Sequence, residues 1–213
     1  MSSSFNRRDF INSAACSVLG FSGITAFASA PQLIQPVNAD NINILGPREG
    51  YTPHIGSLVS MMNWMRAMML RSVEGMGTEE LDFLLDENAN SIGGMLLHRA
   101  ATDKLYQLLT FKNLAPQELM DSPEFEPFQA GMELGDRGRK EIKGNNLNYY
   151  LEILEDTRNE TLKEFSKRDD DWLMMTDEDF PWGPTNNYCK WFHVCEHESN
   201  HNGQIKLIKS RIS

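Results

Sequence analysis

Apolar residues recur every three or four positions along four long stretches of this 213-residue chain, and that spacing is the strongest constraint on its fold. Side chains at this spacing share one face of an α-helix, so each stretch predicts a helix with one buried side. The predicted helices cover residues 53–74, 91–109, 147–165 and 188–212. The sequence shows no alternating β-branched runs of the kind that indicate strands. The expected fold is therefore all-α, a four-helix bundle.

The connections between these helices differ in length. Residues 113–144 carry Pro, Asp and Gly and are expected to form a loop with one short helix near residues 133–143. Residues 177–187, which open Asp-Glu-Asp-Phe-Pro-Trp-Gly-Pro, are expected to form a second loop. The helices and loops together form a single domain, which suits the length of the chain.

The first 39 residues are predicted to be a secretory leader. Adjacent Arg7 and Arg8 precede a short, mildly apolar run, which resembles a twin-arginine signal peptide. The best cleavage site follows Ala39, and a second candidate follows Ala30. Residues 40–213 would then be the helical domain. The mature protein is expected to be periplasmic or otherwise exported by the twin-arginine pathway, without stable membrane insertion after cleavage.

Three of the five histidines lie four residues apart in the last predicted helix, at His193, His197 and His201. The outer two are about 12 Å apart along the helix axis, so one metal ion can bind only an adjacent pair. His197 and His201 share their stripe with Ile205 and Ile208, so this pair is expected to face the core. His193 lies at the edge of the stripe and is expected to flank the site.

His98 is the strongest candidate for a third ligand. It lies in the middle of the second helix, on a face with Met95 and Leu105. Buried imidazoles without partners are costly, which favours two helices that present their histidines to one ion. Three imidazoles are expected to hold a divalent metal ion, Zn²⁺, Ni²⁺, Fe²⁺ or Mn²⁺. His54, in the first turn of the first helix, is expected at the surface.

Two protease motifs overlap in the last helix, but neither is expected to mark a protease. His197-Glu198-Ser-Asn-His201 fits H-E-x-x-H, and His193-Val-Cys-Glu196-His197 fits H-x-x-E-H. A zincin needs a third ligand further along the chain, and the residues after His201 include no His, Asp or Glu. Glu198 still directly follows a ligand histidine, where a carboxylate can act as general base. It is the candidate catalytic residue.

The segments Ser91–His98 and His193–Ile205 together resemble the DinB/YfiT-like metal-binding helical bundles, and the similarity covers essentially the whole mature chain. The resemblance implies a four-helix bundle, often a homodimer, that holds a divalent ion through His98, His197 and His201. Characterised members include thiol S-transferases and metal-dependent hydrolases or isomerases.

Some nearby side chains are not expected to reach the metal. Asp103 stands where many family members have Glu, but its helical angle directs it away from His98. Cys195 likewise faces away from His197, and it lies about 9 Å along the axis from Cys189, too far for a disulfide. Trp182, in the second loop, is a candidate wall for a pocket.

The leading functional expectation is an exported metal-dependent hydrolase that acts on a small molecule, with Glu198 as general base. The first alternative is a metal-dependent thiol S-transferase, in which the ion lowers the pKa of a bound thiol. Export counts against it, because low-molecular-weight thiols are mainly cytoplasmic. The second alternative is a non-catalytic bundle stapled by its metal. Nucleic acid is not an expected partner, because a net charge of -10 would repel phosphates.

Overall fold

The computed structural model describes residues 41–212. The predicted signal peptide, residues 1–39, lies outside this part of the chain. Among the described residues, no helix is both long and apolar enough to cross a membrane.

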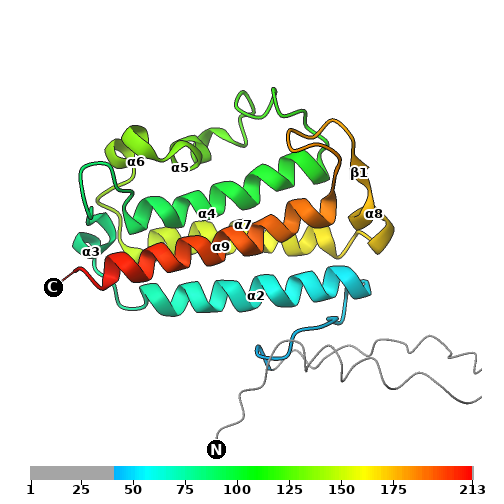
Figure 1. Ribbon diagram of the computed structural model, residues 1–213, viewed down its shortest axis with the longest axis horizontal. Coiled ribbons are helices and arrows are strands. Elements are labelled where there is room, and N and C mark those ends of the chain that lie inside the picture. Colours follow the sequence, from blue (N-terminus) through cyan, green and yellow to red (C-terminus); the bar gives the residue numbers. More distant parts are fainter. Residues whose placement is uncertain (1–40, 213) are drawn as a thin grey trace, which may run out of the picture. The chain divides into compact units, whose positions relative to one another are not determined.

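Four long helices make up the bundle: α2 (Pro53–Val73), α4 (Ile92–Tyr106), α7 (Leu147–Phe165) and α9 (Asn187–Lys209). Figure 1 shows α4 and α9 side by side, with α2 next to α9 and α7 behind them. The predicted all-α four-helix bundle is confirmed, and each predicted long helix is present with ends shifted by a few residues.

Local sequence signals explain where these helices begin. Ser91, Asn146 and Asn186 are N-cap residues, and each side chain accepts a hydrogen bond of 2.8 to 3.0 Å from the backbone N–H three residues ahead. The first helix begins instead at Pro53, whose missing N–H costs nothing at that position. The carboxylate of Asp170 accepts hydrogen bonds from the backbone N–H groups of the next two residues, His54 and Ile55.

The connections contain short elements that the periodicity did not predict, because helices and strands of two to five residues carry too few apolar positions. The predicted helix near residues 133–143 is present as α6. The loop at 177–187 is closed by two short antiparallel strands, in which Thr176 pairs with Asn186. The elements outside the four long helices are α3 (Thr78–Asp82), a π-helical turn (Gln107–Phe111), a 3₁₀ turn (Glu126–Phe128), α5 (Gln129–Glu133), α6 (Gly135–Glu141), α8 (Asp170–Met174), β1 (Thr176–Asp177) and β2 (Thr185–Asn186).

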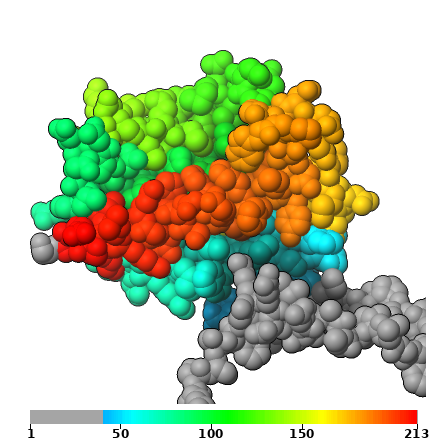
Figure 2. Space-filling model, viewed as in Figure 1, coloured from blue at the N-terminus to red at the C-terminus, as the bar shows by residue number. Residues whose placement is uncertain are grey.

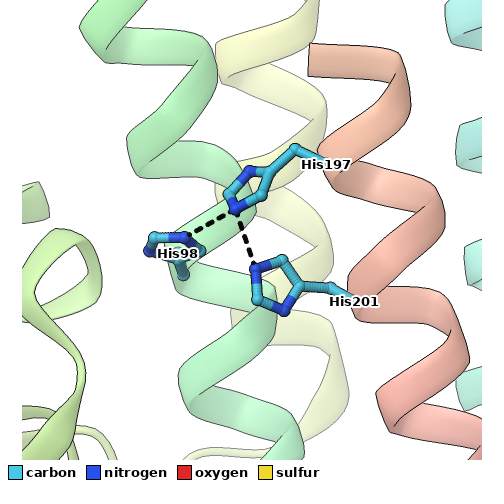
Figure 3. A group of neighbouring side chains, drawn as sticks. All are labelled: His98, His197 and His201. Carbon is cyan, nitrogen blue, oxygen red and sulfur yellow. Dashed lines mark hydrogen bonds between the residues drawn. The ribbon is translucent and has the colours of Figure 1, made fainter. Parts of the chain in front are cut away.

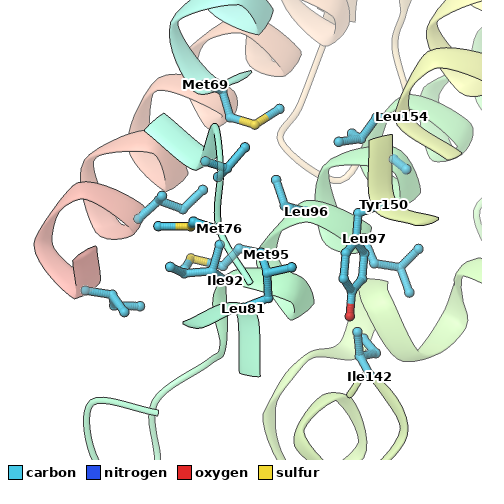
Figure 4. Close-up of a cluster of buried hydrophobic side chains, with 14 residues drawn as sticks. Met69, Met76, Leu81, Ile92, Met95, Leu96, Leu97, Ile142, Tyr150 and Leu154 are labelled. Carbon is cyan, nitrogen blue, oxygen red and sulfur yellow. The ribbon is translucent and has the colours of Figure 1, made fainter. Parts of the chain in front are cut away.

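The apolar core forms two main clusters, one toward each end of the bundle. The first, drawn in Figure 4, includes Met69, Leu96 and Leu154. The second includes Met62 and Trp191. Along α2, α7 and α9 the buried arginine, glutamate and histidine side chains fall between these clusters, and those of α4 lie between Leu97 of the first cluster and Tyr106 of the second. The bundle therefore has a polar layer between two apolar ends.

Figure 2 shows α9 lying across one face of the molecule, with α2 on one side of it and the segment that contains α5 and α6 on the other. The residues of α5 pack against α4. This arrangement places α5 beside the middle of α4, where the polar layer includes His98.

Candidate metal centre

The imidazole rings of His98, His197 and His201 meet between α4 and α9 (Figure 3). The Nε2 atom of His197 lies 3.1 Å from Nε2 of His98 and 3.0 Å from Nε2 of His201. The histidines of α9 are one turn apart and face α4, because four residues complete slightly more than one helical turn. The structure therefore brings together all three predicted ligands.

A backbone carbonyl of α5 orients the ring of His98. Nδ1–H of His98 donates to the carbonyl oxygen of Gly131 at 2.8 Å, so the lone pair is on Nε2, toward the other two rings. Only glycine allows this approach: a Cβ on Gly131 would lie 2.9 Å from Cγ of Leu97 and 3.1 Å from its backbone carbonyl carbon. The close packing of α5 on α4 thus sets the orientation of the His98 ring.

The ring of His201 is oriented from within its own helix. Its Nδ1 atom lies 2.9 Å from Oε1 of Gln204, and an N–H at Nδ1 that donates to this oxygen leaves the Nε2 lone pair for an ion. Gln204 is exposed, so this contact stands at the edge of the site.

His197 has two neighbours at Nδ1. The Nη1 atom of Arg99 lies 2.9 Å from it, and Oγ1 of Thr102 lies 3.3 Å from it. The Thr102 hydroxyl donates its own hydrogen to the carbonyl oxygen of His98 and therefore has a lone pair for an Nδ1–H. The guanidinium of Arg99 can only donate, so in this geometry Nδ1 of His197 accepts from it and the ring hydrogen is on Nε2, toward the other two rings. To give its Nε2 lone pair to an ion, the ring would carry its hydrogen on Nδ1, where the Thr102 hydroxyl is the available acceptor.

The three rings are neutral near pH 7, as ligands must be. Burial lowers the pKa of His98 to about 4. Burial, with the positive charge of Arg99 adding to it, lowers the pKa of His197 to about 2. One ring nitrogen from each histidine can be chosen so that the three atoms lie within 4.8 Å of one another. An all-imidazole set of this kind suits Zn²⁺, Ni²⁺ or Fe²⁺, and the residues fit a divalent ion.

Comparison with known proteins places this chain, including its three clustered histidines, in a protein family. The model of the family described as mycothiol-S-transferase matches residues 57–213, a range that contains all three. The chain belongs to the mycothiol-S-transferase family. This family is DinB/YfiT-like, so the resemblance seen in the sequence is confirmed. No curated protein matches the chain.

The structure of this mycothiol-S-transferase family member gives Glu198 a different place from the one expected of a general base. Its carboxylate is fully buried and accepts hydrogen bonds from three guanidinium groups, at 2.7, 3.1 and 3.3 Å. The donors are Arg66, Arg99 and Arg158. Burial alone would raise the pKa of Glu198, but these positive charges outweigh it and hold the pKa at about 2. A carboxylate held in this way is a weak base, and it faces the core.

These arginines are the main feature of the site that the sequence reasoning missed. Arg66 continues the apolar stripe of α2 between Met62 and Met69, and Arg158 continues that of α7 between Leu154 and Phe165. An arginine in an apolar stripe is a signal of a buried ion pair. Asp103 belongs to the same network: its carboxylate accepts from Nε of Arg158 at 3.0 Å, which agrees with its exclusion as a ligand.

His193 flanks the three candidate ligands of this mycothiol-S-transferase family member. Its ring stacks on that of His197, with ring centres 5.1 Å apart and planes 20° apart. Trp182 meets the ring of His193 edge-on, at 5.1 Å between ring centres and 84° between planes. Cys189 and Cys195 are both free thiols, and neither lies in the histidine group. His54 is exposed at the start of α2, as expected, and bonds to Asp170 at 2.9 Å.

Proposed function

We propose that this protein is a metal-dependent thiol S-transferase. The observation that carries the proposal is the convergence of three neutral imidazoles in a chain of the mycothiol-S-transferase family. The substrates would be a low-molecular-weight thiol, of which mycothiol is the one that the family description names, and a small electrophile. In the reaction a C–S bond forms, the bond from that carbon to a leaving group breaks with its electron pair, and the thiol proton is released.

Separate residues of this chain would bind the ion and orient its ligands. His98, His197 and His201 would hold the ion, which when bound lowers the pKa of a thiol so that the nucleophile is available near neutral pH. Gly131 and Gln204 orient two of the three rings. The buried side chains of Arg99 and Thr102 exclude water from the Nδ1 side of His197. Three protein ligands would leave one coordination position of the ion open for the thiol.

This proposal replaces the hydrolase that we expected first. That expectation depended on Glu198 as the general base for a water molecule, and Glu198 is occupied by three guanidinium groups. S-transfer has no such requirement, because a thiol is far more acidic than water. The family match also supports the thiol S-transferase alternative over the hydrolase.

Metal analysis combined with a transfer assay tests the proposal. The purified protein is loaded with Zn²⁺, and conjugation of mycothiol to chlorodinitrobenzene is followed by the absorbance of the product. We expect close to one ion per chain and metal-dependent conjugation, with both lost in His98→Ala and His201→Ala. The matched control is His54→Ala, a histidine outside the site. Wild-type protein that binds no metal would overturn the proposal.

The same experiment separates catalysis from the non-catalytic alternative. A protein that unfolds when its metal is removed and that never conjugates thiol would be a metal-stapled bundle. A folded apoprotein whose activity returns with the ion would be an enzyme.

Export through the twin-arginine pathway is a separate proposal, supported by the sequence around Arg7 and Arg8. Changing both residues to Lys should keep the protein in the cytoplasm of the producing cell. Unchanged export of this variant would remove the proposal without affecting the proposed chemistry.

A further inference from the structure

The side of His197 that faces the N-terminal end of α9 is covered by a fourth histidine. The ring of His193 is half-buried and lies parallel to that of His197, with ring centres 5.1 Å apart. His193 therefore stacks directly on one member of the histidine group that can hold the ion. Trp182, which is 58% exposed, stands edge-on to His193 and forms an apolar wall beside its ring.

A buried tyrosine determines which nitrogen of His193 carries a hydrogen. The hydroxyl oxygen of Tyr106 lies 2.8 Å from Nδ1 of His193. Tyr106 is 1% exposed, and its hydroxyl has no other hydrogen-bond partner among residues 41–212. A buried O–H without an acceptor is costly, so this O–H donates to Nδ1. Burial also raises the pKa of Tyr106, which keeps its proton.

The consequence is a free donor at the other nitrogen. With Nδ1 accepting from Tyr106, the hydrogen of the neutral His193 ring is on Nε2. A protonated ring would carry a hydrogen there as well, so the donor is present in either charge state. Nε2 of His193 has no protein partner within the described part of the chain. A half-buried donor beside a candidate metal centre suits an acceptor atom on a bound ligand.

We propose that His193 is a substrate-binding residue whose Nε2–H donates a hydrogen bond to an acceptor oxygen of the thiol substrate, with Trp182 as the apolar wall beside it. The proposal rests on the proposed S-transferase function and narrows its substrate class. The preferred thiol would carry an amide or carboxylate oxygen close to its sulfur atom, rather than a plain alkyl chain. Tyr106 acts through His193 and is a positioning residue.

Two thiols that differ in this oxygen test the proposal. N-acetylcysteine carries amide and carboxylate acceptors, whereas propanethiol carries none. The protein is loaded with Co²⁺, and thiol binding is followed by the sulfur-to-cobalt charge-transfer absorption, which needs no turnover. We expect His193→Phe, which retains an aromatic ring against His197, to weaken N-acetylcysteine binding about five- to tenfold and to change propanethiol binding less than about twofold.

Further variants separate a hydrogen bond from a structural effect. His193→Gln provides an amide N–H and should restore part of the affinity for N-acetylcysteine. Tyr106→Phe leaves either nitrogen of His193 free to carry the hydrogen, so it should weaken N-acetylcysteine binding about two- to threefold. His54→Phe, at an exposed histidine that contacts Asp170, should match wild type with both thiols. The cobalt content should be equal in all variants.

The outcomes distinguish this proposal from the proposed function. If neither thiol produces the absorption band in wild-type protein, the S-transferase function fails, and the role of His193 fails with it. If both thiols bind but His193→Phe weakens both equally or neither, the assignment of His193 is wrong and the S-transferase function stands.

Discussion

Arg99 and His197 connect the candidate metal centre to the buried charges of the bundle. The Nη1 atom of Arg99 lies 2.9 Å from Nδ1 of His197, while its Nη2 donates to the Glu198 carboxylate at 3.1 Å. One guanidinium therefore contacts the ring of a candidate ligand, His197, and the carboxylate of the next residue, Glu198.

Gln204→Leu should lower the metal affinity without harming the fold. The change removes the oxygen that accepts from Nδ1 of His201, and loss of such an outer contact typically costs about 10–100-fold in affinity. Because Gln204 is exposed, the urea midpoint of the metal-free protein should not change. Competition with a chelator measures the affinity. An unchanged affinity would mean that Gln204 does not orient His201.

Glu198→Gln should destabilise the fold rather than abolish the chemistry. Removing this charge leaves three guanidinium groups without their shared carboxylate, and breaking a buried ion pair costs about 3–5 kcal/mol. Glu196→Gln, at an exposed neighbour, should stay within about 0.5 kcal/mol of wild type. Urea denaturation gives both values. A Glu198→Gln protein of full stability that has lost activity would restore Glu198 as a catalytic base.

The metal-free protein should lose stability as the pH falls from about 6.5 to 4. Burial lowers the pKa of His98 from 6.5 to about 4 in the folded state, so in this range the unfolded chain binds a proton that the folded chain does not. Full protonation of the unfolded state would remove about 3 kcal/mol. Urea midpoints across this range should show the decline, and His98→Ala should make it shallower; a slope remains because the folded pKa of His197, about 2, is also well below its unfolded value. A pH-independent midpoint would contradict the lowered pKa.

A second loss should follow at lower pH. The folded pKa of Glu198, about 2, lies below its ordinary value near 4.5, so the stability that its ion pairs provide is present above pH 4.5 and declines toward pH 2. Asp103 is the other carboxylate of this buried network, so the acid unfolding of Asp103→Asn is compared with that of Glu198→Gln. Acid unfolding followed by circular dichroism should show a shallower decline for Glu198→Gln. An identical acid transition in wild type and Glu198→Gln would count against the ion pairs.

Gly131→Ala should weaken both the fold and the metal site. The added methyl group would lie 2.9 Å from Cγ of Leu97, and such overpacking typically costs about 1–3 kcal/mol. Because the carbonyl of Gly131 orients His98, displacement of α5 should also lower the metal affinity. The control is Gly203→Ala in α9, where a Cβ meets no atom within 4 Å and Ala should raise the stability by about 1 kcal/mol. Equal behaviour of the two variants would refute the close approach of α5.

The sequence by itself determined the four long helices and the three histidines. Helical periodicity depends only on which residues lie three or four positions apart, so it showed that His197 and His201 share a buried face and that His98 lies in the stripe of another helix. It also indicated that His193 stands at the edge of that face. These conclusions needed no knowledge of which helices are neighbours.

Only the tertiary structure decided what surrounds those histidines. Glu198 has the sequence position of a base, but Arg66 from α2 and Arg158 from α7 reach it across the bundle, and their charges set its role. The carbonyl of Gly131 likewise comes from α5, a helix too short to show in the periodicity. Hydrogen bonds and ion pairs act over a few ångströms in space, regardless of separation along the chain, so contacts between helices had to come from the fold.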